Sequence, residues 1–160
     1  MNALSLEVDC SRVFITALNK AVSARSHILP RIHVCFRGED IVEDGGLGAI
    51  LGTGELDGQK WTSLLHKDDV APTLDAIHKS KLEKSASHNE CYVIARFKKE
   101  RHMSPSVYRW LFWECSSCDE SQFCWVYEVS SDPIFDKLLT QLEISRKRYL
   151  PTLEVFAIGT

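Results

Sequence analysis

The chain has 160 residues, of which 44% are hydrophobic and 26% charged, and its net charge is -3 at pH 7. This composition predicts one globular domain with a sizeable core and no overall basic surface for nucleic acid. No apolar run approaches the ~18 residues of a membrane helix. The first ten residues also lack the basic and apolar regions of a secretory signal. We therefore expect a cytoplasmic protein that binds neither nucleic acid nor a membrane.

The chain contains six cysteines, at positions 10, 35, 91, 115, 118 and 124. With a core of this size and no secretory signal, reduced thiols are expected rather than a disulfide framework. Cys115 and Cys118 are spaced as half of a zinc site, but the second half is missing. Cys115 and Cys124 could also approach each other across a hairpin. A redox or metal role for Cys115, Cys118 and Cys124 therefore remains open at this point.

The N-terminal part of the chain predicts one helix and one hairpin. A helix is expected from about Arg12 to Ala24, because apolar residues recur on one face. This stripe consists of Val13, Phe14, Ala17, Leu18, Ala21 and Val22. Residues 31–36 alternate as a strand, residues 41–43 form a second strand, and residues 47–51 a short helical turn. The apolar stripe can face either its own domain or a second copy of the chain.

The middle of the chain predicts a short apolar turn over residues 61–65 and then a helix. Asp68 and Asp69 are interpreted as helix caps, because carboxylates accept the first backbone N–H groups and meet the positive end of the dipole. Pro72 is best accommodated in a first turn, which predicts a helix start near these two residues. The apolar face of this helix consists of Val70, Leu74 and Ile77.

The remainder predicts three strands and a helix. Residues 90–98, 106–115 and 123–130 are rich in apolar and aromatic side chains and are separated by polar turns, which favours antiparallel neighbours. Ser131-Asp132-Pro133 is typical of a helix start. The helix is expected to end before Pro151, and the basic residues 146–148 in its last turn are interpreted as partners of the helix dipole.

Three segments of the chain, in their order and spacing, resemble segments of PAS domains. The resemblance covers about residues 28–131. The segments are Gly52…Glu55-Leu56-Asp57-Gly58-Gln59-Lys60-Trp61, Leu64-Leu65-His66-Lys67-Asp68-Asp69, and Tyr108-Arg109-Trp110-Leu111. The resemblance implies an α+β fold, in which a five-stranded antiparallel sheet carries short helices on one face. Residues 1–27 would form a flanking helix, residues 28–131 the PAS domain, and residues 132–160 a C-terminal signalling helix and tail. Residues 43–46 depart from the family pattern, which weakens the transfer of ligand contacts from that part.

In PAS domains the strand residue that corresponds to Trp110 tends to face outward, so Leu111, Trp113 and Cys115 are expected to point inward. On the last strand we expect Trp125, Tyr127 and Val129 to point inward as well. PAS domains often bind a small molecule between sheet and helix. The expected pocket residues are Val70, Leu74, Ile77, Leu111, Trp113, Trp125, Tyr127 and Val129. Because a close-packed core is the default, a filled or small cavity is favoured.

The same alternation places Tyr108, Trp110 and Phe112 on the outer face of the sheet. Such a face is too apolar to be left in water, so either a terminal helix or a partner is expected to cover it. The expected partner-binding face consists of Tyr108, Trp110, Phe112, Phe14 and Leu18. The partner would be a second copy of the chain or another protein, bound through the flanking helices or this outer face.

The resemblance argues against two cofactors of the family. Flavin photochemistry of the LOV type needs a reactive cysteine, which residues 58–61 lack. Haem binding in some PAS domains uses a histidine on the central helix, where only His66 and His78 occur, at its ends. The glycines of residues 45–54 lack the pattern of a phosphate-binding loop. No catalytic set of residues can be singled out. We expect a PAS-type sensory and signal-relay module, not an enzyme, that binds a small ligand or a protein partner. The alternative is a ligandless dimerisation domain.

Overall fold

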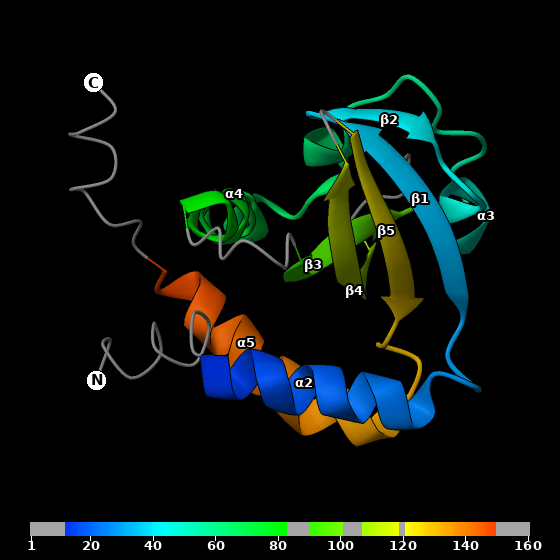
Figure 1. The fold of residues 1–160 in the computed structure, drawn as a ribbon. Coiled ribbons are helices and arrows are strands. Elements are labelled where there is room, and N and C mark those ends of the chain that lie inside the picture. The colour runs from blue at the N-terminus through cyan, green and yellow to red at the C-terminus, as the bar shows by residue number, and fades with distance from the viewer. Residues whose placement is uncertain (1–11, 83–89, 101–106, 119–120, 150–160) are drawn as a thin grey trace.

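The computed structural model describes residues 12–82, 90–100, 107–118 and 121–149. Five antiparallel strands form one curved sheet in the order β2-β1-β5-β4-β3 (Figure 1). The elements are α2 (Arg12–Arg25), β1 (Arg31–Arg37), β2 (Asp40–Glu43), α3 (Leu47–Leu51), the 3-10 turn η1 (Trp61–Leu64), α4 (Lys67–Leu82), β3 (Glu90–Lys99), β4 (Val107–Cys118), β5 (Ser121–Glu128), the 3-10 turn η2 (Pro133–Phe135) and α5 (Asp136–Lys147). The α+β arrangement expected from the sequence is confirmed, and it is consistent with a PAS-like fold.

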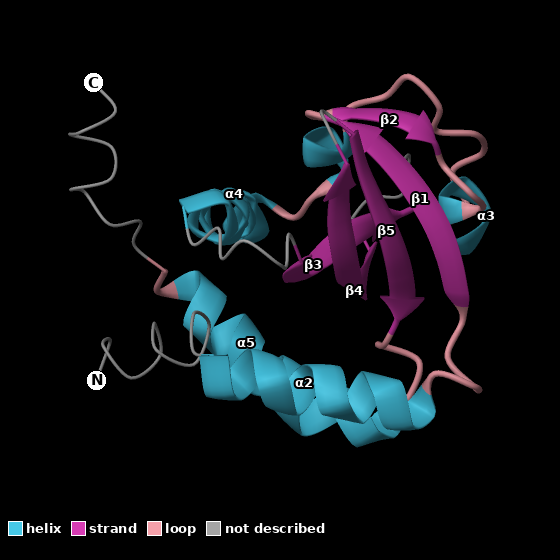
Figure 2. Cartoon of the chain, viewed as in Figure 1, coloured by secondary structure: helices cyan, strands magenta, loops and turns pink. Residues whose placement is uncertain are grey.

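The two faces of the sheet bury two separate apolar clusters, because side chains alternate along each strand. The inner cluster lies between the sheet and the elements α3, η1 and α4. The outer cluster lies between the sheet and the two terminal helices, α2 and α5. In Figure 2, α2 and α5 lie on the same side of the sheet, while α3 and α4 lie on other sides of it. The expected flanking helices are thus part of the folded core.

Helix α4 begins at Lys67, and Pro72 lies inside it rather than in its first turn. The proline therefore removes one backbone donor within the helix and does not mark the helix start. That start is held instead by the contacts of His66 and Asp69, which are described below. By contrast, the expected start of the last helix is confirmed: Asp132 caps η2 by accepting the Ile134 N–H at 3.1 Å, with Pro133 in the first position.

The glycine-rich segment before η1 is a close-packed corner. A side chain on Gly45 would place its Cβ 1.7 Å from the His33 carbonyl oxygen, and one on Gly48 would place it 1.8 Å from the Gly54 carbonyl oxygen. Asp44 holds the same corner by accepting two backbone N–H groups, from Gly46 at 3.0 Å and Leu56 at 2.9 Å. Burial raises the pKa of Asp44, but these backbone donors outweigh it and bring the pKa below its usual value. Packing accounts for these glycines without a phosphate ligand.

Among the described residues, no helix has both the length and the apolar character needed to cross a membrane.

The packing of α2 against the sheet can be tested by substituting one buried and one exposed residue of this helix. Leu18 is completely buried, whereas Val13 is 78% exposed. We expect Leu18→Ala to lower the free energy of unfolding by about 3 kcal/mol, because it empties a core position. Val13→Ala is the matched control and should change it by less than about 0.5 kcal/mol. Urea denaturation measures both; equal effects would contradict the docking of α2.

Candidate functional site

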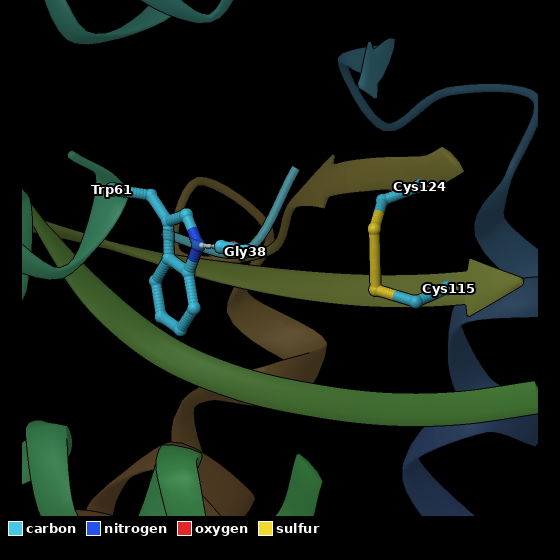
Figure 3. Close-up of a disulfide and its surroundings, with 4 residues drawn as sticks. All are labelled: Gly38, Trp61, Cys115 and Cys124. Atoms are coloured by element: carbon cyan, nitrogen blue, oxygen red, sulfur yellow. Dashed lines mark hydrogen bonds between the residues drawn. A yellow bond between two sulfur atoms is a disulfide. The ribbon is translucent and has the colours of Figure 1, made fainter. Parts of the chain in front are cut away.

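Four aromatic rings pack against one another on the inner face of the sheet. Trp113 of β4 lies at their centre, with ring centroids 4.9 Å from Phe36 and 4.8 Å from Phe97, both stacked, and 5.7 Å from Trp61. All four side chains are buried. Trp61 is fixed in turn, because its Nε1 donates to the Gly38 carbonyl at 2.9 Å (Figure 3). These rings pack in the region that the sequence predicted for a ligand.

Half of the predicted pocket residues lie together in this inner cluster: Val70, Ile77, Leu111 and Trp113. Their contact with a ligand stays a prediction. One polar atom in the region is notable, since Trp113 Nε1 is buried and has no hydrogen-bond acceptor among the described residues. A buried donor without an acceptor costs about 1–3 kcal/mol, so this is a position where a bound acceptor would stabilise the fold.

The other four predicted pocket residues lie elsewhere. Leu74 is 43% exposed, because the sheet-facing side of α4 is formed by Val70, Thr73 and Ile77 instead. Trp125 is 41% exposed. Tyr127 and Val129 are buried, but in the outer cluster.

The orientation predicted for β5 was therefore wrong by one residue. Directly opposite residues share a face of the sheet, and Trp113 lies opposite Val126. Cys124 and Val126 are consequently the inward residues of β5. Trp125 points to the outer face, where the Arg31 guanidinium lies 4.4 Å from its ring centroid and His33 packs edge-on at 4.7 Å.

Cys115 and Cys124 form a disulfide between β4 and β5, and the expectation of reduced thiols was wrong for this pair (Figure 3). The two residues lie directly opposite each other, with Cα atoms 4.2 Å apart. The side chain of Cys118 lies outside the described part of the chain, so the half zinc site is not tested there. Within that described part, no group of three or more histidine, cysteine or acidic side chains is placed to hold a metal ion.

Asp69 is a charged residue that is buried and has several polar partners. Its carboxylate is completely buried in the first turn of α4. Arg96 of β3 surrounds it: the backbone N–H and Nε donate to Oδ2 at 2.5 and 3.1 Å, and Nη2 donates to Oδ1 at 2.8 Å. Arg96 also lies 4.9 Å from the ring centroid of Trp110, its neighbour on β4. The interpretation of Asp69 as a helix cap was thus incomplete, since its carboxylate binds a second element.

Arg146 of α5 reaches the same carboxylate from the other side. Its Nη1 lies 3.2 Å from Asp69 Oδ1, and its Nη2 donates to the Ile94 carbonyl of β3 at 2.8 Å. Arg146 lies in the last turn of α5, as expected, but it is also buried, and its contact with a carboxylate was not foreseen from the sequence. We call Asp69, Arg96 and Arg146 the charge cluster. It joins α4, β3 and α5.

Sequence reasoning missed the charge cluster, although one signal was present. Arg96 is a charged residue inside the apolar run Val93-Ile94-Ala95-Arg96-Phe97. An arginine at such a position needs a buried carboxylate, because an unpaired buried charge costs several kcal/mol. The acidic pair before α4 was a candidate for that carboxylate. Nothing in the sequence distinguished Arg146 from its exposed neighbours Lys147 and Arg148.

Further polar contacts hold α5 near both of its ends. At the start, Arg25 of α2 forms an ion pair with Asp132, with Nε 3.0 Å from Oδ2. The Arg25 side chain is partly exposed, so this pair contributes less than about 1 kcal/mol. Beyond the end, Tyr149 Oη donates to Asp75 of α4. Helix α5 is therefore connected to α2 at one end and to α4 at the other.

The predicted partner-binding face is covered by the chain itself. Trp110 and Phe112 are buried together with Phe14 and Leu18 of α2 in the outer cluster. The first of the two expected alternatives therefore holds, and these four residues are not accessible to a partner in this structure. Tyr108 lies apart from them, half-buried against His66 with ring centroids 4.7 Å apart.

Glu128, at the end of β5, is a second buried carboxylate. It accepts the hydroxyl groups of Ser130 at 2.6 Å and Ser131 at 2.5 Å, and Arg109 Nη1 lies 3.9 Å away. Ser130 Oγ in turn accepts the Trp110 N–H at 3.1 Å. These contacts fix the segment that leads from the sheet into η2 and α5.

His66 precedes α4 and caps it as a neutral imidazole. Its Nδ1 accepts the Asp68 N–H at 3.0 Å, and its own backbone N–H donates to the Arg96 carbonyl at 3.0 Å. Burial lowers the pKa of His66 below its usual value, and the charge of Arg96 lowers it further. The carboxylates of Asp69 and Asp68 offset only part of this effect.

Comparison with solved structures finds similar chains. The chain is similar to the N-terminal domain of a diguanylate cyclase with a PAS/PAC sensor from Marinobacter aquaeolei, with a TM-score of 0.46 and 14% sequence identity. The match covers 64% of this chain and 98% of that domain. No protein-family model and no curated protein matches the sequence.

The role of His66 predicts a pH dependence of stability. Since the folded pKa is lowered, the unfolded chain takes up a proton first as the pH falls through about 6.5. The contribution of His66 to stability is therefore complete above that pH and is lost below it. His66→Asn keeps an acceptor for the Asp68 N–H but does not titrate. We expect the wild-type protein to lose more unfolding free energy than this variant between about pH 7.5 and 5.5. Urea denaturation at both pH values tests this, and parallel losses would refute it.

Proposed function

We propose that the chain is a sensory and signal-relay module in which changes in the inner core are passed to helix α5 through the charge cluster. The observation that carries this proposal is the completely buried carboxylate of Asp69, held by one arginine from the sheet and one from α5. In the domain organisation that we propose, residues 28–131 form the sensing domain. Residues 1–27 and 132–160 are the flanking segments that carry the output.

The position of Arg96 supports the input side of the relay. Arg96 lies between Ala95 and Phe97 on β3, and both neighbours belong to the inner cluster. Phe97 stacks on Trp113 at the centre of the aromatic rings. A displacement of these rings therefore moves the strand segment whose backbone N–H and guanidinium hold Asp69. The path from the core to the carboxylate consists of adjacent residues of one strand.

The energetics of Arg146 support the output side. A buried guanidinium is stable only while its partners remain in place, because an uncompensated buried charge costs about 3–5 kcal/mol. If Asp69 and the Ile94 carbonyl shift together, Arg146 has to follow them or leave for solvent. Helix α5 then has two discrete arrangements, docked or released, which is what a relay element requires.

The same contacts argue against a catalytic role. Asp69 is inaccessible to a substrate and its oxygens are already bound by donors. Glu128 is likewise buried and occupied by serine hydroxyl groups. These two buried carboxylates thus serve internal contacts, and we propose no enzymatic activity.

A second candidate function is the binding of a small molecule on the inner face. It rests on Trp113 Nε1, the buried donor for which the described residues provide no acceptor. The candidate ligand is apolar and flat, with one hydrogen-bond acceptor, and it would bind among Phe36, Trp61 and Phe97. Binding would change the stacking around Trp113 and so supply an input to the relay. Native mass spectrometry of freshly purified protein tests this candidate, which a purely apo mass would contradict.

The relay predicts that a core substitution increases amide hydrogen exchange in α5 only while Arg146 is present. Phe97→Leu removes the ring that stacks on Trp113, next to Arg96. We expect it to increase amide hydrogen exchange in residues 139–147 about tenfold more than in α2. In the Arg146→Met background, where the contacts of α5 with Asp69 and the Ile94 carbonyl are already lost, Phe97→Leu should add no further increase in α5. Exchange monitored by mass spectrometry measures both helices at once.

Two control variants make this test specific. Arg148→Met removes an exposed charge from the same helix end and should leave the exchange of α5 unchanged. Phe123→Leu alters an exposed ring on β5 and should not affect α5 either. The relay is refuted if Phe97→Leu raises exchange equally throughout the chain, or if its effect on α5 persists without Arg146.

A further inference from the structure

Three cysteines lie in one row across the sheet. Cys91 of β3 lies directly opposite Cys115 of β4, and Cys115 lies directly opposite Cys124 of β5. All three belong to the inner cluster, so their side chains share one face. Opposite residues of neighbouring antiparallel strands have Cβ atoms about 4.5–5.5 Å apart. The sulfur of Cys91 is therefore adjacent to the Cys115–Cys124 disulfide.

The three positions differ in their access to solvent. Cys124 is completely buried and Cys115 nearly so, whereas Cys91 is only half-buried. A thiol in solution cannot easily reach the two sulfurs of the disulfide, and thiol–disulfide exchange requires direct attack of a thiolate on sulfur. Cys91 is the member of the row that is closest to solution.

We infer that Cys91, Cys115 and Cys124 form a thiol–disulfide exchange site, in which Cys91 connects the buried disulfide to thiols in solution. The Cys91 thiolate attacks Sγ of Cys115, and a Cys91–Cys115 bond forms. The Cys115–Cys124 bond breaks, and its electron pair goes to Sγ of Cys124, which takes up a proton. Because the three residues lie in a row, the attacking and leaving sulfurs lie on opposite sides of Cys115, as this displacement requires. The step needs no external oxidant or reductant.

The chemical class of the substrate follows from the exposed position of Cys91. A low-molecular-weight thiol such as glutathione then attacks Sγ of Cys91 in the new disulfide. This releases Cys115 as a thiol and leaves a mixed disulfide on Cys91. A second thiol resolves the mixed disulfide, so that two thiols are oxidised to one disulfide and the protein is reduced by two electrons. The reverse sequence reoxidises the protein from oxidised glutathione.

The exchange moves a cross-link from one strand pair to another. The initial disulfide joins β4 to β5, whereas the Cys91–Cys115 disulfide joins β3 to β4. Strand β3 also carries Arg96 and the Ile94 carbonyl, which hold Asp69 and Arg146. That the redox state of this site is an input to α5 rests on the proposed function; the exchange itself does not.

Peptide mapping tests the exchange directly in the intact chain. Trypsin leaves Cys91 in peptide 85–96 and places Cys115, Cys118 and Cys124 together in peptide 110–137. In protein treated with oxidised glutathione, the initial disulfide lies within the second peptide. After brief exposure to reduced glutathione and an acid quench, we expect a species in which the two peptides are linked. Further cleavage after Glu114 and Glu120 separates Cys124 from Cys115 and Cys118, and repeating the experiment with Cys118→Ser assigns the link to Cys115.

Matched variants test the role of Cys91. We expect Cys91→Ser to abolish the linked species and to slow reduction of the Cys115–Cys124 disulfide by glutathione about tenfold or more. Cys35→Ser is the control, because Cys35 is also half-buried but lies opposite the exposed Phe123 on the outer face. It should leave the reduction rate unchanged. The inference is overturned if no linked species forms, or if Cys91→Ser is reduced as fast as the wild-type protein.

Hydrogen exchange separates the chemistry from its role as an input. If the linked species forms and the exchange of α5 differs between oxidised and reduced protein, both the site and its input role are supported. If the linked species forms and α5 is unaffected, the input role is overturned. If no linked species forms while the Phe97 and Arg146 variants behave as expected, this inference is overturned and the relay stands.

Discussion

A completely buried carboxylate has to be surrounded by donors, and in this chain the donors of Asp69 come from two other elements. Arg96 supplies three hydrogen bonds from β3, and Arg146 supplies an opposite charge from α5. Removing such charges from water costs several kcal/mol for each ion, so the cluster is stable only when α4, β3 and α5 are placed together. The helix that follows the sheet is consequently a part of the core, and its last turn is bound to α4 and β3 through Arg146.

The sheet separates two sets of contacts that the charge cluster brings together again. On the inner face, Trp113 stacks between Phe36 and Phe97, and the cysteine row lies further along the same strands. On the outer face, α2 and α5 cover Trp110 and Phe112. Strand β3 contributes to both faces, because its successive side chains alternate. Arg96 therefore lies between two residues of the inner cluster and binds the carboxylate that Arg146 of α5 also contacts.

The order and type of the elements could be predicted from the sequence, because periodicity and helix-start signals are local properties. The orientation of β5 could not be read in this way, since it depends on the register of a hairpin. The two expectations for that hairpin were in fact incompatible: a Cys115–Cys124 contact requires Cys124 to face inward, and Trp125 then faces outward. The burial of Arg146 was also hidden, since helix-end arginines at neighbouring positions look alike and only the tertiary contact with Asp69 distinguishes them. The apolar face predicted for α4 was wrong at Leu74 for a similar reason. Thr73 rather than Leu74 is buried against the sheet.

A double-mutant cycle between Asp69 and Arg146 tests most directly whether α5 is coupled to the core through the charge cluster. Asp69→Asn, Arg146→Met and the double variant would be compared with the wild-type protein by urea denaturation. The buried ion pair predicts a coupling energy of about 2 kcal/mol or more, whereas the partly exposed pair of Arg25 and Asp132 should give less than about 1 kcal/mol. Additive effects of the Asp69 and Arg146 substitutions, within about 0.3 kcal/mol, would contradict the account.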